Sequence, residues 1–173
     1  MIINLIPLGN IDLSLLDKLS EDLQLKFSAD CQILKALDLP PIAYNSERNQ
    51  YQAGKILERI SELKLPVRSK TLGIYDVDLY TADSNFVFGQ AEMGDRDCVI
   101  SLFRLNPEFY GQEFDEQIFY SRILKEAVHE LGHTFRLYHC PDAKCVMHFS
   151  NSLKDTDYKS SEFCKRCKSE LNL

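Results

Sequence analysis

The sequence predicts an α/β fold in which helices pack on a mostly parallel sheet. Strand-length apolar stretches alternate with stretches of helical spacing, in the order strand, helix, strand, helix, three strands and a long helix. A two-residue turn at Gly94 and Asp95 requires one antiparallel pairing, because parallel strands need a longer crossover. A length of 173 residues suggests one domain with a substantial core.

The first half of the chain is expected to contain two strands and two helices. In order, these are a strand at 2–6, an amphipathic helix at 14–23, a strand at 27–34 and an amphipathic helix at 47–63. Pro7 ends the first strand, and Pro40 and Pro41 begin a loop that runs to about residue 45.

The second half is expected to contain three strands and one long helix. The strands are placed at 71–79, 86–89 and 98–105. Asp115 is a candidate N-cap for the long helix. Its apolar face is lined by Ile123, Ala127, Val128, Leu131 and Phe135. Within the single domain, residues 1–114 hold the sheet and upper helices, and residues 115–173 hold the last helix and a tract that needs some further source of order.

Charge and composition exclude several functions. The net charge is −6, from 20 basic and 26 acidic residues, which disfavours nonspecific binding to nucleic acid or anionic membrane. No apolar run approaches the ~18 residues needed to span a bilayer. The apolar start at residues 1–7 lacks a basic leader and a cleavage site, so we expect a cytoplasmic, monomeric protein with reduced cysteines.

The reactive residues are concentrated near the C-terminus. All 4 histidines and four of the 6 cysteines fall between positions 129 and 167. His129 and His133 form an HExxH pattern with Glu130, and this spacing places both imidazoles on one helix face. With His139 as a third ligand, a zinc ion would keep a fourth position for water, which is the catalytic arrangement. Glu130 could take a proton from that water. A chance match on an amphipathic helix is the alternative.

Two cysteine pairs form a second constellation. The pairs are Cys140-x4-Cys145 and Cys164-x2-Cys167. Four thiolates at such spacing suit a closed, structural zinc, whose binding free energy would order the C-terminal tract. The alternatives are two disulfides, four free thiols, or a zinc ribbon that binds nucleic acid. Residues 154–170 carry five basic and four acidic residues, a balance too weak to favour a ribbon.

Three further residues of these types are not assigned to a site. Cys31 and Cys98 stand alone in predicted strands and are expected in the core. His148 is expected to be a solvated loop residue.

The combined pattern resembles the archaemetzincin family of zinc-dependent metallopeptidases. The resemblance rests on His129-Glu130-x2-His133-x5-His139-Cys140-x4-Cys145-x-Met147, on Cys164-x2-Cys167, on the upstream Asn85-Phe86-Val87-Phe88-Gly89, and on Asp157 and Phe163. It implies a five-stranded mixed sheet, an active-site helix and a cleft above the metal.

The same resemblance implies roles for individual residues. It implies a catalytic zinc on the three histidines, a structural zinc on the four cysteines and Glu130 as general base and acid. Met147 would be the Met-turn residue beneath the imidazoles, although it could equally be an ordinary core methionine. The edge strand, with Phe86, Val87, Phe88 and Gly89, would pair with an extended peptide substrate.

One position departs from the family pattern. Metzincins have a glycine where this chain has Arg136, and that glycine adopts a left-handed conformation. A non-glycine residue there costs about 1–2 kcal/mol, which a zinc site contributing ~10 kcal/mol or more could absorb. The leading hypothesis is a zinc metallopeptidase with two zinc ions per chain. The alternative is a non-catalytic, zinc-stabilised binding module whose cleft is altered by Arg136.

Overall fold

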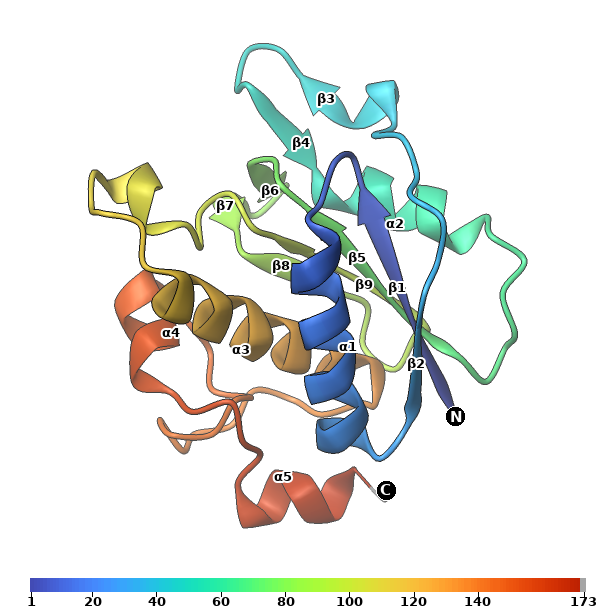
Figure 1. Cartoon of the computed structure of the whole chain (residues 1–173), viewed down its shortest axis with the longest axis vertical. Helices are drawn as coiled ribbons and strands as arrows, with labels where there is room; N and C mark the ends of the chain where they lie inside the picture. The colour runs from blue at the N-terminus through green and yellow to red at the C-terminus, as the bar shows by residue number, and fades with distance from the viewer. Residues whose placement is uncertain (172–173) are drawn as a thin grey trace.

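The molecule is built around a five-stranded mixed sheet, seen in a computed structural model that describes residues 1–171 (Figure 1). The strand order is β2-β1-β5-β9-β8. The strands are β1 (Ile2–Leu8), β2 (Asp30–Ile33), β5 (Lys70–Tyr75), β8 (Gly89–Ala91) and β9 (Asp97–Ser101). Only the β8–β9 pair is antiparallel. The predicted mixed sheet with one antiparallel pairing is therefore confirmed.

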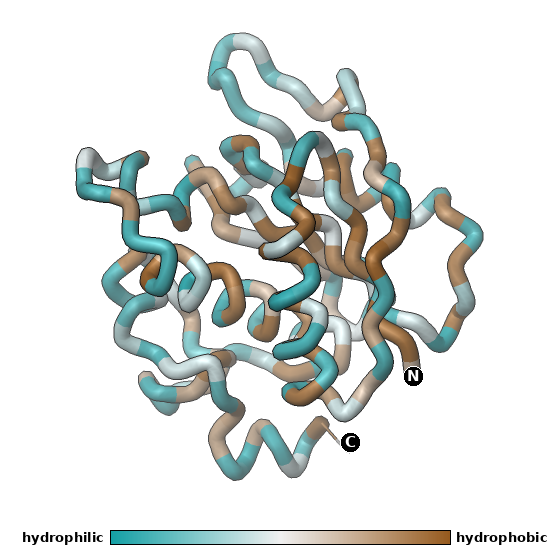
Figure 2. The backbone as a smooth tube through the Cα atoms, viewed as in Figure 1, coloured by the Kyte–Doolittle hydropathy of each residue, from teal (hydrophilic) through white to brown (hydrophobic). Residues whose placement is uncertain are grey.

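Helices cover both faces of this sheet. Helices α1 (Leu13–Phe27) and α3 (Glu116–Thr134) lie on one face, and α2 (Ala53–Ser61) lies on the other (Figure 1). Side chains of β1 alternate between the two resulting cores, with Ile3 in one and Ile6 in the other. Figure 2 shows the hydrophobic stretches running along the central strands, between the helices. No helix within residues 1–171 has the length and hydropathy needed to cross a membrane.

A second, four-stranded sheet was not predicted. It has the order β3-β4-β6-β7. Its strands are β3 (Tyr44–Asn45), β4 (Gln50–Gln52), β6 (Leu79–Thr81) and β7 (Ser84–Val87). Its pairings are tertiary, such as Tyr51 with Leu79, so a local pattern cannot reveal them.

This second sheet corrects three predicted elements. The helix predicted at 47–63 begins only at Ala53, because the preceding residues pair as strands. The strand predicted at 71–79 divides, since its last residue belongs to β6. The strand predicted at 86–89 also divides. Phe86 and Val87 end β7 in the small sheet, and Gly89 begins β8 at the edge of the large sheet.

Two other boundaries differ from the prediction. Phe27 ends helix α1 instead of starting a strand, because its ring is buried in the core with the other apolar residues of that helix. The strand predicted at 98–105 ends at Ser101. Short helical segments complete the fold: η1 (Pro41–Ala43), η2 (Pro107–Tyr110), α4 (Leu153–Tyr158) and α5 (Lys165–Glu170).

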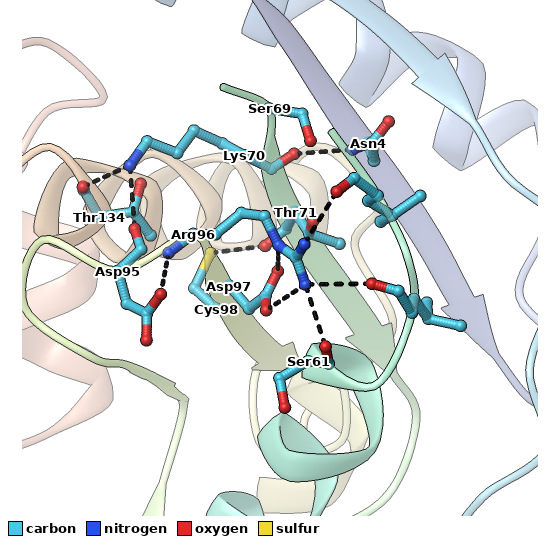
Figure 3. A network of polar contacts seen from close by, with 12 residues as sticks. Asn4, Ser61, Ser69, Lys70, Thr71, Asp95, Arg96, Asp97, Cys98 and Thr134 are labelled. Atoms are coloured by element: carbon cyan, nitrogen blue, oxygen red, sulfur yellow. Dashed lines mark hydrogen bonds and ion pairs between the residues drawn. The ribbon is translucent and has the colours of Figure 1, made fainter. Parts of the chain in front are cut away.

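Helix α3 is fixed at both ends. The Asp115 side chain accepts a hydrogen bond from the Ile118 N–H, which confirms the predicted N-cap. At the other end, Lys70 Nζ donates to the Thr134 carbonyl at 2.6 Å and to the Asp95 carbonyl at 2.9 Å (Figure 3). A cation is favourable at a helix C-terminus. The sheet and the β8–β9 loop therefore hold the end of α3 that carries the histidines.

Candidate zinc centres

Three histidines converge beside a cleft. His129 and His133 lie one turn apart on α3, and His139 follows the helix. A ring nitrogen of each lies within 4.8 Å of the other two. The structure thus brings together the three residues that the sequence proposed as one ligand set.

Two of these imidazoles are oriented by backbone carbonyls. Nδ1 of His129 lies 2.8 Å from the Val146 carbonyl, and Nδ1 of His133 lies 2.7 Å from the Leu137 carbonyl. A carbonyl can only accept, so each Nδ1 is assigned the hydrogen and each Nε2 a lone pair. The two Nε2 atoms face each other at 3.1 Å. A metal ion between the two nitrogens would remove the repulsion between their lone pairs, and neutral imidazoles are good zinc ligands.

Burial supports the neutral form of these rings. Burial is the main cause that lowers the pKa of His129, well below its usual range, and of His133 and His139. The nearby charge of Lys159 lowers all three pKa values further. The histidines therefore present unprotonated nitrogens at neutral pH.

Arg136 makes the turn that leads to His139. Its φ is 67°, so it adopts the left-handed conformation expected at the position where metzincins have glycine. Its side chain packs over Gly94 in the β8–β9 loop and does not line the cleft. The Arg136 side chain therefore does not block the cleft.

Glu130 is buried at the floor of the same cleft. Burial raises the pKa of its carboxyl group well above the usual range, and the neighbouring Glu126 carboxylate raises it further. A β-carbon at Gly89 would come within 2.6 Å of Glu130 Cγ. The glycine at the start of β8 therefore leaves the space that the Glu130 side chain occupies. A carboxylate of raised pKa is a stronger base.

The cleft has a volume of about 440 Å³. Its walls come from three segments: the β7–β8 region, helix α3 with His139, and the chain at 149–151. The predicted substrate-strand residues Phe86, Val87, Phe88 and Gly89 all line it.

Met147 lies against α3 between the two helical histidines. It is fully buried, and a β-carbon at Gly132 would come within 2.4 Å of its sulfur. Gly132 separates His129 from His133 in the HExxH pattern, so the methionine packs directly against the ligand-bearing turn.

The four cysteines form a second cluster. The Sγ atoms of Cys140, Cys145, Cys164 and Cys167 all lie within 4.8 Å of one another. Cys140 Sγ and Cys164 Sγ are 3.7 Å apart. A disulfide bond would need about 2.05 Å, whereas a tetrahedral site with Zn–S distances of ~2.3 Å places sulfurs about 3.8 Å apart. The geometry fits a metal site and does not fit the disulfide alternative.

Hydrogen-bond donors reach three of the four sulfurs and stabilise negative charge there. The Cys164 N–H donates to Cys145 Sγ at 3.3 Å, and the Arg166 guanidinium donates to Cys140 Sγ at 3.3 Å. Hydrogen bonds, first from the Cys167 backbone, lower the pKa of Cys164 to about 7, whereas burial raises the pKa of Cys145 and of Cys167. Among residues 1–171, these cysteines and the three histidines are the two groups that could hold a metal.

The remaining histidine and cysteines are placed as follows. Cys31 lies in β2 and Cys98 in β9, and both contact the core as expected. His148 lies in a loop as predicted, but it is not fully solvated. It is half-buried, and its Nδ1 lies 2.9 Å from the Cys140 carbonyl.

Sequence reasoning missed two charged residues behind the histidines. Glu126 lines the cleft one turn before Glu130, and Lys159 is completely buried with its Nζ 3.1 Å from Glu126 Oε1. In the sequence, Lys159 stands in a polar stretch and looks like any surface lysine. Its burial depends on tertiary packing, so no local signal could have identified it.

The fold and the two ligand groups define a protein of the zinc metallopeptidase kind. Residues 24–173 match the model of Peptidase family M54. The chain is 43% identical over 172 residues to an archaemetzincin of Pyrococcus furiosus, covering 96% of this chain and 90% of the relative. The chain belongs to Peptidase family M54, the family of the archaemetzincins.

Solved structures agree with this assignment. An archaemetzincin from Archaeoglobus fulgidus, crystallised with malonate, matches with a TM-score of 0.85 at 38% identity, over 98% of this chain and 99% of that one. A zinc-dependent peptidase from Methanocorpusculum labreanum matches with a TM-score of 0.89 at 29% identity, over 98% and 100% of the two chains. The family predicted from the sequence is confirmed.

Proposed function

We propose that this protein is a metzincin-type peptidase that hydrolyses peptide bonds with a zinc ion held by His129, His133 and His139. A second zinc, held by the four cysteines, would have a structural role, which gives two ions per chain. The observation that carries this proposal is the pair of Nε2 atoms facing each other at 3.1 Å next to the buried Glu130.

The chemistry divides between the ion and the protein. Zinc bound there would polarise the scissile carbonyl and lower the pKa of a bound water molecule to ~7. Glu130 would take the proton from the attacking water and pass it to the leaving amine. Its raised pKa supports both roles, because the group must accept the proton and later release it at neutral pH. Met147 would support the imidazoles from below.

The substrate would be a peptide or protein bound in extended form. Strand β8 lies at the edge of the large sheet and lines the cleft, so its free edge can pair with a substrate backbone. The predicted strand 86–89 divides between β7 and β8, and we propose that only β8, which begins at Gly89, pairs with the substrate backbone. Phe86 and Val87 would contact substrate side chains. We propose a monomer that acts in the cytoplasm, where thiols remain reduced.

The proposal is tested by digesting a diverse peptide mixture with the protein. Parallel reactions contain a chelator or the Glu130→Ala variant, and a Glu116→Ala variant at the exposed start of α3 serves as the matched control. We expect cleavage by the parent and by Glu116→Ala, and none with chelator or Glu130→Ala. If Glu130→Ala cleaves as fast as the parent, the mechanism is wrong. If no Glu130-dependent cleavage is found, the result would favour the binding module.

A further inference from the structure

The third histidine lacks the anchor that the other two have. His129 and His133 each have a carbonyl at Nδ1, but among residues 1–171 no hydrogen bond to the ring of His139 is found. His139 is exposed, and its ring contacts Phe149 at a centroid distance of 4.9 Å. Its position must therefore be set through its backbone, and above all through its neighbour Cys140.

Both backbone groups of Cys140 are held by the same short segment. The Cys140 N–H donates to the Met147 carbonyl at 2.8 Å. The Cys140 carbonyl accepts from His148 Nδ1, 2.9 Å away. These two bonds join the backbone of Cys140, the neighbour of His139, to Met147 and His148.

His148 is in turn linked to α3 through a buried ion pair. Lys159 Nζ donates to the His148 carbonyl at 3.4 Å and lies 3.1 Å from Glu126 Oε1. The Thr156 hydroxyl donates to the same Glu126 oxygen at 3.2 Å. The Lys159 side chain is 0% exposed. A buried ammonium is costly unless it is paired, so its geometry is tightly constrained.

We propose that His148 and Lys159 are positioning residues for the third zinc ligand. They form a strut that runs from Glu126 on α3 through Lys159 and His148 to the Cys140 carbonyl. The strut replaces the ring anchor that His139 lacks. This inference rests on the proposed function, because it assigns the strut to the zinc site on the histidines.

The strut predicts a much larger effect on the histidine site than on the cysteine site. The test measures zinc release from the fully loaded protein to a competing chelator. We expect His148→Ala to release the histidine-bound ion about 10–100-fold more readily, the range typical for loss of an outer-shell partner. His148→Asn should restore tight binding, because its amide N–H can donate where Nδ1 did. In a His133→Ala background, where only the cysteine site remains, His148→Ala should loosen the remaining ion much less, because three other cysteines also hold it.

The ion pair is tested with both charges removed together. Lys159→Met alone leaves Glu126 unpaired in the interior and can unfold the protein, so it is combined with Glu126→Gln. We expect the double variant to fold, to keep the cysteine-bound ion and to release the histidine-bound ion more readily. Lys154→Met, at an exposed position of the same segment, is the matched control and should behave as the parent.

The outcomes separate the strut from the proposed function. A His148→Ala variant that holds both ions as tightly as the parent overturns the strut. Equal loosening of both ions also overturns it, because the residue would then be supporting the fold in general. A parent protein that binds zinc on the histidines but cleaves no peptide overturns the proposed function and leaves the strut intact.

Discussion

The two ligand clusters meet at adjacent residues, His139 and Cys140, yet their surroundings differ. The three histidines border a cleft of about 440 Å³, and the buried carboxylate of Glu130 lies beside them. Three of the four cysteines are buried, and none of them lines that cleft. Open access suits a site that must admit substrate, whereas full enclosure by protein ligands suits a site that only stabilises.

The clusters are also physically connected. Cys145 precedes Val146, whose carbonyl orients His129, and Cys140 directly follows His139. The residues next to the first two cysteines therefore include one histidine of the ligand set, His139, and the carbonyl that orients another, His129. We infer that a metal on the cysteines would fix the positions of the histidines, in addition to ordering the C-terminal region.

The largest expected effect is the loss of the closed site. Cys167→Ser should remove one zinc and unfold the C-terminal region, because a structural zinc contributes on the order of 10 kcal/mol. That is comparable to the whole stability of a domain, about 5–15 kcal/mol. Thermal unfolding, with Cys31→Ser as the matched control outside the cluster, measures the change. An unchanged melting temperature for Cys167→Ser would show that this cluster does not stabilise the fold.

The coupling between the sites is tested at Cys140. Cys140→Ser should lose the structural zinc and also weaken zinc binding at the histidines, by about 10–100-fold if it acts like other outer-shell losses. Chelator competition gives both affinities. A variant that loses the second metal but binds the first as tightly as before would rule out the coupling.

A change confined to the open site should affect catalysis only. In Gly89→Ala the new methyl group would lie 2.6 Å from Glu130 Cγ and 2.7 Å from the Val99 carbonyl oxygen, so both Glu130 and strand β8 must shift. A displacement of about 1 Å can reduce the rate 10²-fold. We expect both zinc ions to remain while kcat falls by that order. If Gly89→Ala had a normal kcat, either Glu130 would have no role in catalysis or strand β8 would have shifted enough to leave Glu130 in place.

The smallest expected effect is at Arg136. Replacing it by glycine relieves the left-handed conformation, which should stabilise the protein by about 1 kcal/mol. For a domain of this size that raises the melting temperature by roughly 2–4 °C. Peptide cleavage should be unchanged, since the side chain packs on Gly94 outside the cleft. If the parent were inactive and Arg136→Gly active, the binding-module alternative would be favoured.

The sequence was most informative where spacing alone determines geometry. The HExxH spacing, the cysteine pairs and the cap at Asp115 are local features, and the structure places these residues as the spacing implies. The family resemblance added the conformation expected at Arg136, and its φ of 67° agrees.

The sequence was least informative where the geometry depends on distant partners. Residues 50–52 were assigned to a helix, but Tyr51 pairs with Leu79 in a strand. Lys159 is buried because Glu126, more than thirty positions earlier, meets it inside the fold. His148 contacts Cys140 through a loop whose path no periodicity describes. These contacts form only in the folded chain, so a single sequence does not reveal them.

The most direct test of the two-site account is the zinc content of the purified protein and of its His133→Ala variant. The account predicts two zinc ions per chain in the parent, and one in a His133→Ala protein that remains folded. A parent with one zinc, or a His133→Ala variant that still holds two, would contradict the assignment of an open histidine site beside a closed cysteine site.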